Sequence, residues 1–120
     1  MESARFRLWH LVAFAVVLVS GCTPPQVAVI SVQLESRMDD GGKWDLLGGP
    51  PDPYIVVNGR SYRNHACEDS FHCSFRVKGA RWYRIEVYDR DDVRDTLAGK
   101  VWCFSGQECR DRLASVKVLD

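Results

Sequence analysis

Two neighbouring stretches of strictly alternating residues constrain the fold of this chain more than any other feature. Residues 71–78 place Phe, Cys, Phe and Val at every second position, with polar residues between them, and residues 82–88 repeat the pattern with Tyr, Ile and Val. Successive side chains of a β-strand point to opposite faces, so each stretch predicts a strand with one buried side. Further strands are expected at 27–34, 54–57, 97–104 and 114–119.

The segments between these stretches predict how the strands connect. Asn58-Gly59 directly follows one strand and is a strong two-residue hairpin signal. The apolar pattern changes phase near Ile30, which predicts a bulge in the first strand. Residues 107–113 have a helical alternative of a single turn. Six or seven short strands with Gly, Pro and Asn between them predict an all-β fold, a small antiparallel β-sandwich.

One connection is long for a compact domain. Residues 35–53 hold four glycines and three prolines without useful periodicity, and loops of this length are usually functional or disordered. Within it, Trp44 is expected to anchor the loop or join the core. Leu46 and Leu47, with Val93 further along the chain, are expected near the tips of loops, where they can close the end of the sandwich.

The first 22 residues have the pattern of an export signal. Arg5 and Arg7 precede a twelve-residue apolar run over 8–19, which is too short to span a bilayer comfortably. The tetrad V-S-G-C at 19–22 resembles the lipobox of bacterial lipoproteins, in which the cysteine thiol is joined to diacylglycerol and the cysteine becomes the first residue. A plain secretory signal or a short buried helix are the alternatives.

The lipobox resemblance implies a division of the chain. Residues 1–21 would be a removed signal peptide, residues 22–26 the lipid anchor at Cys22 and a proline-containing tether, and residues 27–120 the folded domain. The expected location is the cell envelope. Thr23 stands where an acidic retention signal would keep a lipoprotein in the inner membrane, so the outer membrane is favoured in a Gram-negative cell.

The cysteines after Cys22 predict disulfide bonds. Four remain in an exported domain, an even number, and three pairings exist. Equal spacing favours Cys67–Cys73 and Cys103–Cys109, with a bridge between Cys73 and Cys103 as an alternative. Zinc bound by the cluster His65, Cys67, His72 and Cys73 is a weaker alternative, because adjacent residues of a regular strand point to opposite faces.

Two acidic stretches carry the remaining functional signal. The first, 44–57, has Asp45 and Asp52 before a strand, and the second, 85–101, follows a strand and is dense in carboxylates at Asp89, Asp91, Asp92 and Asp95. Crowded carboxylates repel one another, and a calcium ion, which takes six to eight oxygen ligands, turns this repulsion into binding. The interleaved Arg90 and Arg94 offer neutralisation without metal as an alternative.

Together the two stretches resemble the C2-type calcium- and phospholipid-binding domain. The matching residues are Gly49, Asp52, Pro53 and Tyr54 in the first, and Val87, Asp89, Asp91, Asp95 and Gly99 in the second. The resemblance implies a C2-like sandwich whose calcium ligands are Asp45, Asp52, Asp89, Asp91 and Asp95. It also implies that the apolar loop tips, Leu46, Leu47 and Val93, contact lipid once calcium is bound. The chain departs from the family in its shorter domain, in the spacing of both loops and in Ala98, which stands where the family usually has a β-branched residue.

Composition narrows the function classes. Sixteen basic and sixteen acidic residues give a net charge of zero, so no nucleic-acid partner is expected. Three histidines leave little material for acid–base catalysis, and no nucleophile–base arrangement stands out. A small hydrolase using the loop aspartates would need a cleft that so small a domain scarcely provides.

The expected function is therefore a non-enzymatic binding module. It would be anchored to the membrane through acylated Cys22 and would bind a lipid, glycan or envelope protein through the two acidic loops, with calcium as its cofactor. The alternative is a metal-independent inhibitor or assembly lipoprotein that recognises a protein partner.

Overall fold

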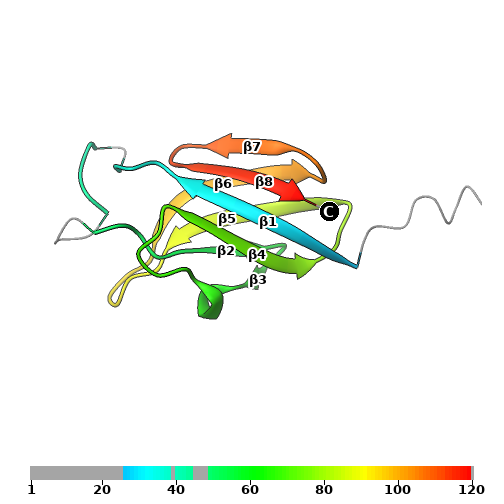
Figure 1. The fold of residues 1–120 in the computed structure, drawn as a ribbon, viewed down its shortest axis with the longest axis horizontal. Helices are drawn as coiled ribbons and strands as arrows, with labels where there is room; N and C mark the ends of the chain where they lie inside the picture. Colours follow the sequence, from blue (N-terminus) through cyan, green and yellow to red (C-terminus); the bar gives the residue numbers. More distant parts are fainter. Residues whose placement is uncertain (1–25, 39, 45–48, 120) are drawn as a thin grey trace, which may run out of the picture.

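A computed structural model describes residues 26–38, 40–44 and 49–119. The predicted signal peptide, Cys22 and most of the predicted tether lie outside this range. The described residues form eight strands and one turn of 3₁₀ helix (Figure 1). In chain order they are β1 (Val27–Leu34), β2 (Pro53–Val57), β3 (Arg60–Ser61), η1 (Arg63–His65), β4 (His72–Lys78), β5 (Trp82–Asp89), β6 (Thr96–Phe104), β7 (Glu108–Asp111) and β8 (Ala114–Leu119).

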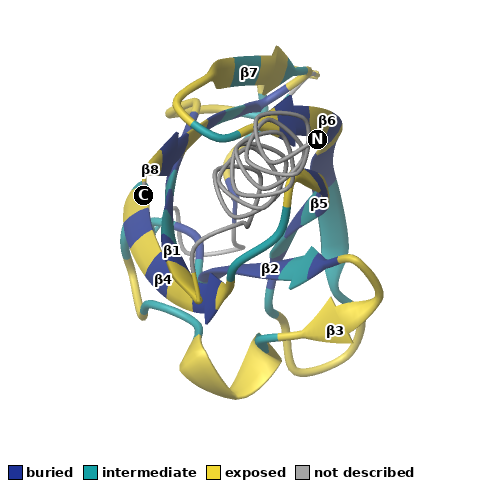
Figure 2. Ribbon diagram, turned by 90° about the vertical axis from the view of Figure 1, so that its right-hand side faces the viewer, coloured by how far each residue is buried: buried dark blue, intermediate teal, exposed yellow. Residues whose placement is uncertain are grey.

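The strands form two four-stranded antiparallel sheets, in the orders β4-β1-β8-β7 and β3-β2-β5-β6. The two sheets pack face to face as a sandwich, which confirms the expected all-β class (Figure 2). In the end-on view the buried positions alternate with exposed ones along the strands. Strand β4 has the cleanest alternation, with Cys73, Phe75 and Val77 buried and the residues between them exposed.

The core fills the space between the two sheets. Its largest fully buried side chains include Tyr83 and Ile85 from β5, Ile55 from β2 and Ile30 from β1. Tyr83 is amphipathic, and its hydroxyl accepts a hydrogen bond from the backbone N–H of Ala80 at 2.8 Å. The buried ring therefore keeps a partner for its polar tip, as a buried tyrosine requires.

Two expectations about local structure are wrong. Strand β1 pairs with β4 and β8 without a shift in register, so it has no bulge, and its buried residues are Ala28, Ile30, Val32 and Leu34. The irregularity lies instead between Val87 and Tyr88, where β5 pairs with β6. Residues 108–111, within the segment with a helical alternative, form strand β7 on the edge of its sheet.

The hairpin prediction is confirmed. Asn58 and Gly59 both have positive φ, 49° and 85°, and join β2 to β3. Glycine and asparagine adopt this left-handed conformation more readily than other residues do. The count of six or seven strands was too low, because the two-residue β3 and the four-residue β7 carry no clear apolar alternation.

Both disulfides have the local pairing that the spacing favoured. Cys67–Cys73 joins the segment after η1 to β4, and Cys103–Cys109 joins β6 to β7 across the two sheets. The zinc alternative is excluded, because Cys67 and Cys73 form a disulfide with each other and so offer no thiolate ligand. His72 is exposed, and its Nε2 lies 2.9 Å from the Ser31 hydroxyl.

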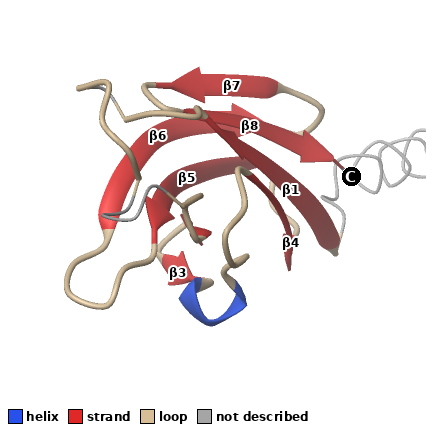
Figure 3. Ribbon diagram, turned by 60° about the vertical axis from the view of Figure 1, so that its left-hand side comes forward, coloured by secondary structure: helices blue, strands red, loops and turns tan. Residues whose placement is uncertain are grey.

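The two ends of the sandwich differ. At one end, named here the loop end, lie the β1–β2 connection, the segment between η1 and β4, and the β5–β6 loop (Figure 3). At the other, the tether end, β1 begins and the β2–β3, β4–β5 and β6–β7 turns meet. Within the described part of the chain, no helix is long and apolar enough to cross a membrane.

Candidate functional site

The two acidic stretches meet at the loop end. Pro53, the first residue of β2, pairs with Asp89, the last residue of β5. This register brings Asp52 beside Asp89 and sets the β5–β6 loop, with Asp91 and Asp95, next to them. Asp45 lies outside the described residues. The meeting of the two stretches agrees with the expectation drawn from the C2 resemblance, while the ligand assignment itself stays a prediction.

Asp52 and Asp89 hold the backbone of the surrounding loops. The Asp52 N–H donates to Asp89 Oδ1 at 2.8 Å, and Asp52 Oδ1 accepts from the Asp69 N–H at 2.7 Å. The Arg90 N–H donates to the Asp52 carbonyl at 2.9 Å. Asp89 is the single charged residue that is buried among those described, with 6% of its surface exposed. These carboxylates satisfy loop amide groups, which buried polar backbone requires.

Asp95 is the centre of a second group of contacts, which includes an ion pair with the Arg63 guanidinium. Arg63 donates from Nε to Asp95 Oδ2 at 2.8 Å and from Nη2 to Oδ1 at 3.2 Å, a bidentate pair. The Tyr54 hydroxyl donates to Oδ2 at 2.5 Å, and the Asp91 N–H donates to Oδ1 at 3.0 Å. Paired N–H donors in this geometry fix both the position and the orientation of a carboxylate.

These contacts shift the titration of their partners. Hydrogen bonds from Arg63 hold the pKa of the Asp95 carboxyl well below its usual range, with the Asp91 N–H and the Tyr54 hydroxyl adding to the effect. Burial, reinforced by the hydrogen bond to Asp95, raises the pKa of the Tyr54 hydroxyl. Asp95 therefore stays ionised, and Tyr54 stays a neutral donor, across the physiological range.

The sequence did not indicate the partner of Asp95. Arg90 and Arg94, which lie within the acidic stretch, are the residues that the metal-free alternative assigned to this role. Arg63 makes this contact instead, from the 3₁₀ turn after β3. The Nη2 of Arg90 lies 3.8 Å from Glu68 Oε1. Arg63 is 32 positions from Asp95, and no local pattern signals a pair at that separation.

The four candidate ligands that the structure describes do not form a calcium cage as they are arranged. Calcium takes six to eight oxygen ligands from convergent groups. In residues 26–38, 40–44 and 49–119, no group of three or more His, Cys, Asp or Glu side chains is placed to hold a metal ion. Each oxygen of the Asp95 carboxylate already accepts two hydrogen bonds, so a calcium ion there would have to replace at least one of these donors. Calcium binding stays a prediction, to which Asp45 is still relevant.

The β5–β6 loop is fastened at its base and exposed at its tip. Arg63 Nη2 donates to the Asp91 carbonyl at 3.2 Å, and the Asp92 N–H donates to Asp91 Oδ1 at 2.9 Å. Beyond these contacts the loop presents Val93, whose side chain is 96% exposed. The tip of the loop is therefore accessible to another molecule.

A depression of about 270 Å³ lies near the long β1–β2 connection. Trp44 forms part of its lining, and the expectation that this residue anchors the loop is confirmed, since it is buried and its indole N–H donates to the Glu35 carbonyl at 2.8 Å. The lining residues are Ser36, Arg37, Lys43, Trp44, Gly49 and Phe71. The two basic side chains, Arg37 and Lys43, give the depression a positive charge.

Replacing Asp95 by asparagine removes the ion pair with Arg63 and should lower the free energy of unfolding at pH 7. The expected loss is about 1 kcal/mol, because solvent screens a pair at the surface. Because the pKa of Asp95 is depressed in the folded state, its contribution is present above the unfolded pKa and is lost as the pH falls below about 4. Urea unfolding at pH 7 and pH 3 measures both effects, and the difference between wild type and variant should shrink at pH 3. Asp92→Asn in the same loop is the control, and an equal loss there would contradict the role given to Asp95.

Comparison of the chain with protein-family models, with curated proteins and with solved structures found no match.

Proposed function

We propose that this chain is a lipid-anchored envelope protein, held in the membrane through acylated Cys22, whose loop end recognises a protein partner without a metal ion. The observation that carries the proposal is the β5–β6 loop, which is fastened through Asp95 to Arg63 and Tyr54 and presents the exposed Val93. The proposed activity is binding, with no chemical step.

The fastened loop supports binding on energetic grounds. Ordering a flexible loop at an interface costs free energy, and a loop that is already held in one conformation avoids much of this cost. An exposed apolar side chain adds affinity when it enters a pocket of the partner. Val93 lies between Asp92 and Arg94, so the tip carries both signs of charge and favours a partner surface with charged groups of both signs around that pocket.

The same contacts favour metal-independent binding over the calcium-dependent form. The carboxylates of Asp52, Asp89 and Asp95 already accept hydrogen bonds from loop amides or from Arg63. The calcium-dependent form, which rests on the C2-like loop pattern, has one observation in its favour, namely that the acidic stretches lie together at one end. In that form the ligand would be a lipid or glycan head group bridged by the ion.

The four described cysteines support a role without a cysteine nucleophile. All four are in disulfides, so none of these thiols is available as a nucleophile. Export of the chain, which the disulfides suit, agrees with an envelope location.

Calcium titration tests the choice between the two forms. We expect the midpoint of thermal unfolding of the full-length acylated protein, in detergent, to be equal in millimolar calcium and in chelator. A ligand that binds only the folded state must raise this midpoint. A calcium-dependent rise of several degrees that Asp89→Asn abolishes would overturn the metal-independent form.

Crosslinking in the native cell tests the loop itself. A photoreactive residue at position 93 should give one discrete protein adduct, which persists in chelator and weakens in the Asp95→Asn background. The same residue at the exposed position 76, on the outer face of β4, is the matched control and should give no such adduct. Equal crosslinking at both positions, or no adduct at position 93, would contradict the proposal.

A further inference from the structure

Three exposed aromatic side chains gather at the tether end. Trp82 begins β5 and pairs in register with Phe104, the last residue of β6, and Trp102 lies two positions before it. Their exposed fractions are 47%, 61% and 55% in the order Trp82, Trp102 and Phe104. The two indole rings have centroids 5.0 Å apart with an interplanar angle of 31°. These three residues are named here the aromatic corner.

Other apolar residues are exposed at the same end. Val27, the first residue of β1, is 46% exposed, and Leu119, the last residue of β8, is 41% exposed. Among the described residues, the one other large apolar side chain with comparable exposure is Val93, at the loop end. Isolated exposed apolar residues are common on proteins, but a gathering of this kind marks a surface that meets a membrane or another molecule.

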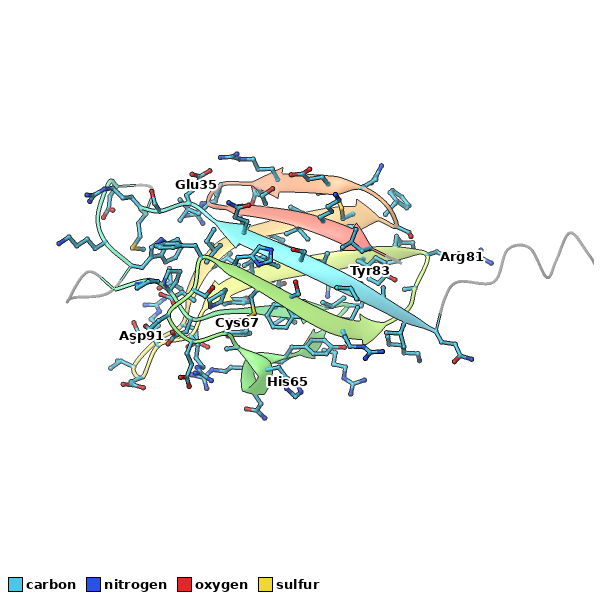
Figure 4. All side chains as sticks on the ribbon, viewed as in Figure 1. Glu35, His65, Cys67, Arg81, Tyr83 and Asp91 are labelled. Carbon is cyan, nitrogen blue, oxygen red and sulfur yellow. A yellow bond between two sulfur atoms is a disulfide. The ribbon has the colours of Figure 1, made fainter. Side chains whose placement is uncertain are left out.

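Charge also separates the two ends. The described segments 26–28, 58–60, 78–84 and 102–108, which lie at or near the tether end, contain the basic residues Arg60, Lys78, Arg81 and Arg84 and one acidic residue, Glu108. The acidic stretches lie at the loop end. Figure 4 labels Arg81 at one end of the sandwich and Asp91 at the other. The tether end therefore suits an anionic surface.

The length of the tether brings this end close to the membrane. Only residues 23–26 separate Cys22 from Val27, where β1 begins. A fully extended chain over that distance spans at most about 18 Å. An eight-residue strand such as β5 is itself about 26 Å long, so an acylated Cys22 reaches the tether end far more readily than the loop end.

We propose that the aromatic corner is a membrane-contact surface, which lies among the anionic phospholipid head groups of the leaflet that holds Cys22. Indole rings favour this interfacial region, because one part of the ring is apolar and its N–H needs a polar partner. The basic residues nearby attract the anionic head groups. In this orientation the tether end of the domain contacts the membrane and the loop end is directed away from it. This inference rests on the lipid anchoring in the proposed function.

Tryptophan quenching tests the orientation in the acylated full-length protein. After removal of the signal peptide, the tryptophans are Trp44 at the loop end and the two of the aromatic corner. In vesicles of phosphatidylethanolamine and phosphatidylglycerol with brominated acyl chains, the protein should lose much of its emission. The double variant Trp82→Phe with Trp102→Phe retains Trp44 as its fluorophore. The emission of this variant should be quenched far less than that of the wild type. In vesicles of phosphatidylcholine with the same brominated acyl chains, the wild-type emission should be quenched less, because these vesicles lack the anionic head group.

The outcomes separate this inference from the anchoring itself. Protein that does not float with the vesicles would show that Cys22 anchoring has failed. Protein that floats but is not quenched would overturn the membrane-contact surface while leaving the anchor intact. Equal quenching in the double variant would place Trp44, and so the loop end, at the lipid, which also overturns it. A concentration-dependent dimer that protects the corner from quenching would assign this surface to a second copy of the chain.

Discussion

Replacing Gly99 by alanine should lower the free energy of unfolding by about 3 kcal/mol, because overpacking at a rigid contact costs on this order. A Cβ built at Gly99 would lie 2.4 Å from the Asp111 carbonyl oxygen and 3.1 Å from the Ala114 Cβ. The first of these atoms belongs to the backbone of the β7–β8 hairpin, and it cannot move aside as a flexible side chain would.

The hairpin is held against β6 by other contacts. The Leu113 N–H donates to the Ala98 carbonyl at 3.1 Å, and the Lys100 N–H donates to Asp111 Oδ2 at 2.9 Å. An added methyl group at position 99 would push the hairpin away from β6 and so disrupt these hydrogen bonds between the two sheets. The expected result is therefore a lower midpoint of unfolding with little change in the slope against denaturant.

Gly106→Ala is the matched control. Gly106 has a φ of 78°, which favours glycine, but a Cβ there would meet no atom within 4 Å. Its replacement should cost about 1 kcal/mol through backbone conformation alone. Urea unfolding of both variants gives the comparison. If Gly99→Ala cost no more than Gly106→Ala, the close approach of the hairpin to β6 would be wrong.

Gly99 also shows how a sequence motif and its structural reason can differ. It belonged to the pattern that resembled the second loop of C2-type domains. In the structure its lack of a side chain admits the β7–β8 hairpin, which is a steric role and needs no metal. A glycine at this position therefore supports the sandwich equally well whether or not the loops bind calcium.

The alternation of apolar and polar residues predicted a strand well where the two faces of that strand differ in burial. Strands β4 and β5 have one buried and one solvent-facing side, so their sequences alternate and their positions were clear. Strand β7 lies on a sheet edge, and its residues are exposed or half-buried, so nothing in Glu108–Asp111 marked it as a strand. The division of strands between two sheets depends on long-range pairing, which alternation alone does not encode.

The candidate site was predictable only where it is local in sequence. The four candidate ligands that the structure describes stand in two short stretches, and the prediction that these stretches meet at one end agrees with the pairing of Pro53 with Asp89. Arg63 comes from a separate turn, so its contact with Asp95 could not be anticipated. Likewise, alternation placed Trp82 on an outward face, but its proximity to Trp102 depends on the register of β5 and β6.

Replacing Cys22 by serine should abolish incorporation of a labelled fatty acid into the protein. The lipobox pattern assigns the acyl chains to this thiol, and a serine hydroxyl lacks the nucleophilic thiolate character of cysteine. Each buried methylene contributes about 0.8 kcal/mol, so several chains hold a protein at the membrane, whereas one chain alone is marginal. The variant should therefore lose its lipid label and most of its stable membrane association.

The control separates acylation from other effects on export. Thr23→Ala changes the next residue and should keep both the label and the membrane association, since the thiol is intact. Label retained in Cys22→Ser would assign acylation to another residue, and no label in the wild type would make the N-terminus a plain secretory signal. In that last case the tether would no longer hold the aromatic corner near lipid. The corner, with its basic neighbours, would then have to bind vesicles by itself, which single exposed indoles and a few lysine and arginine residues achieve only weakly.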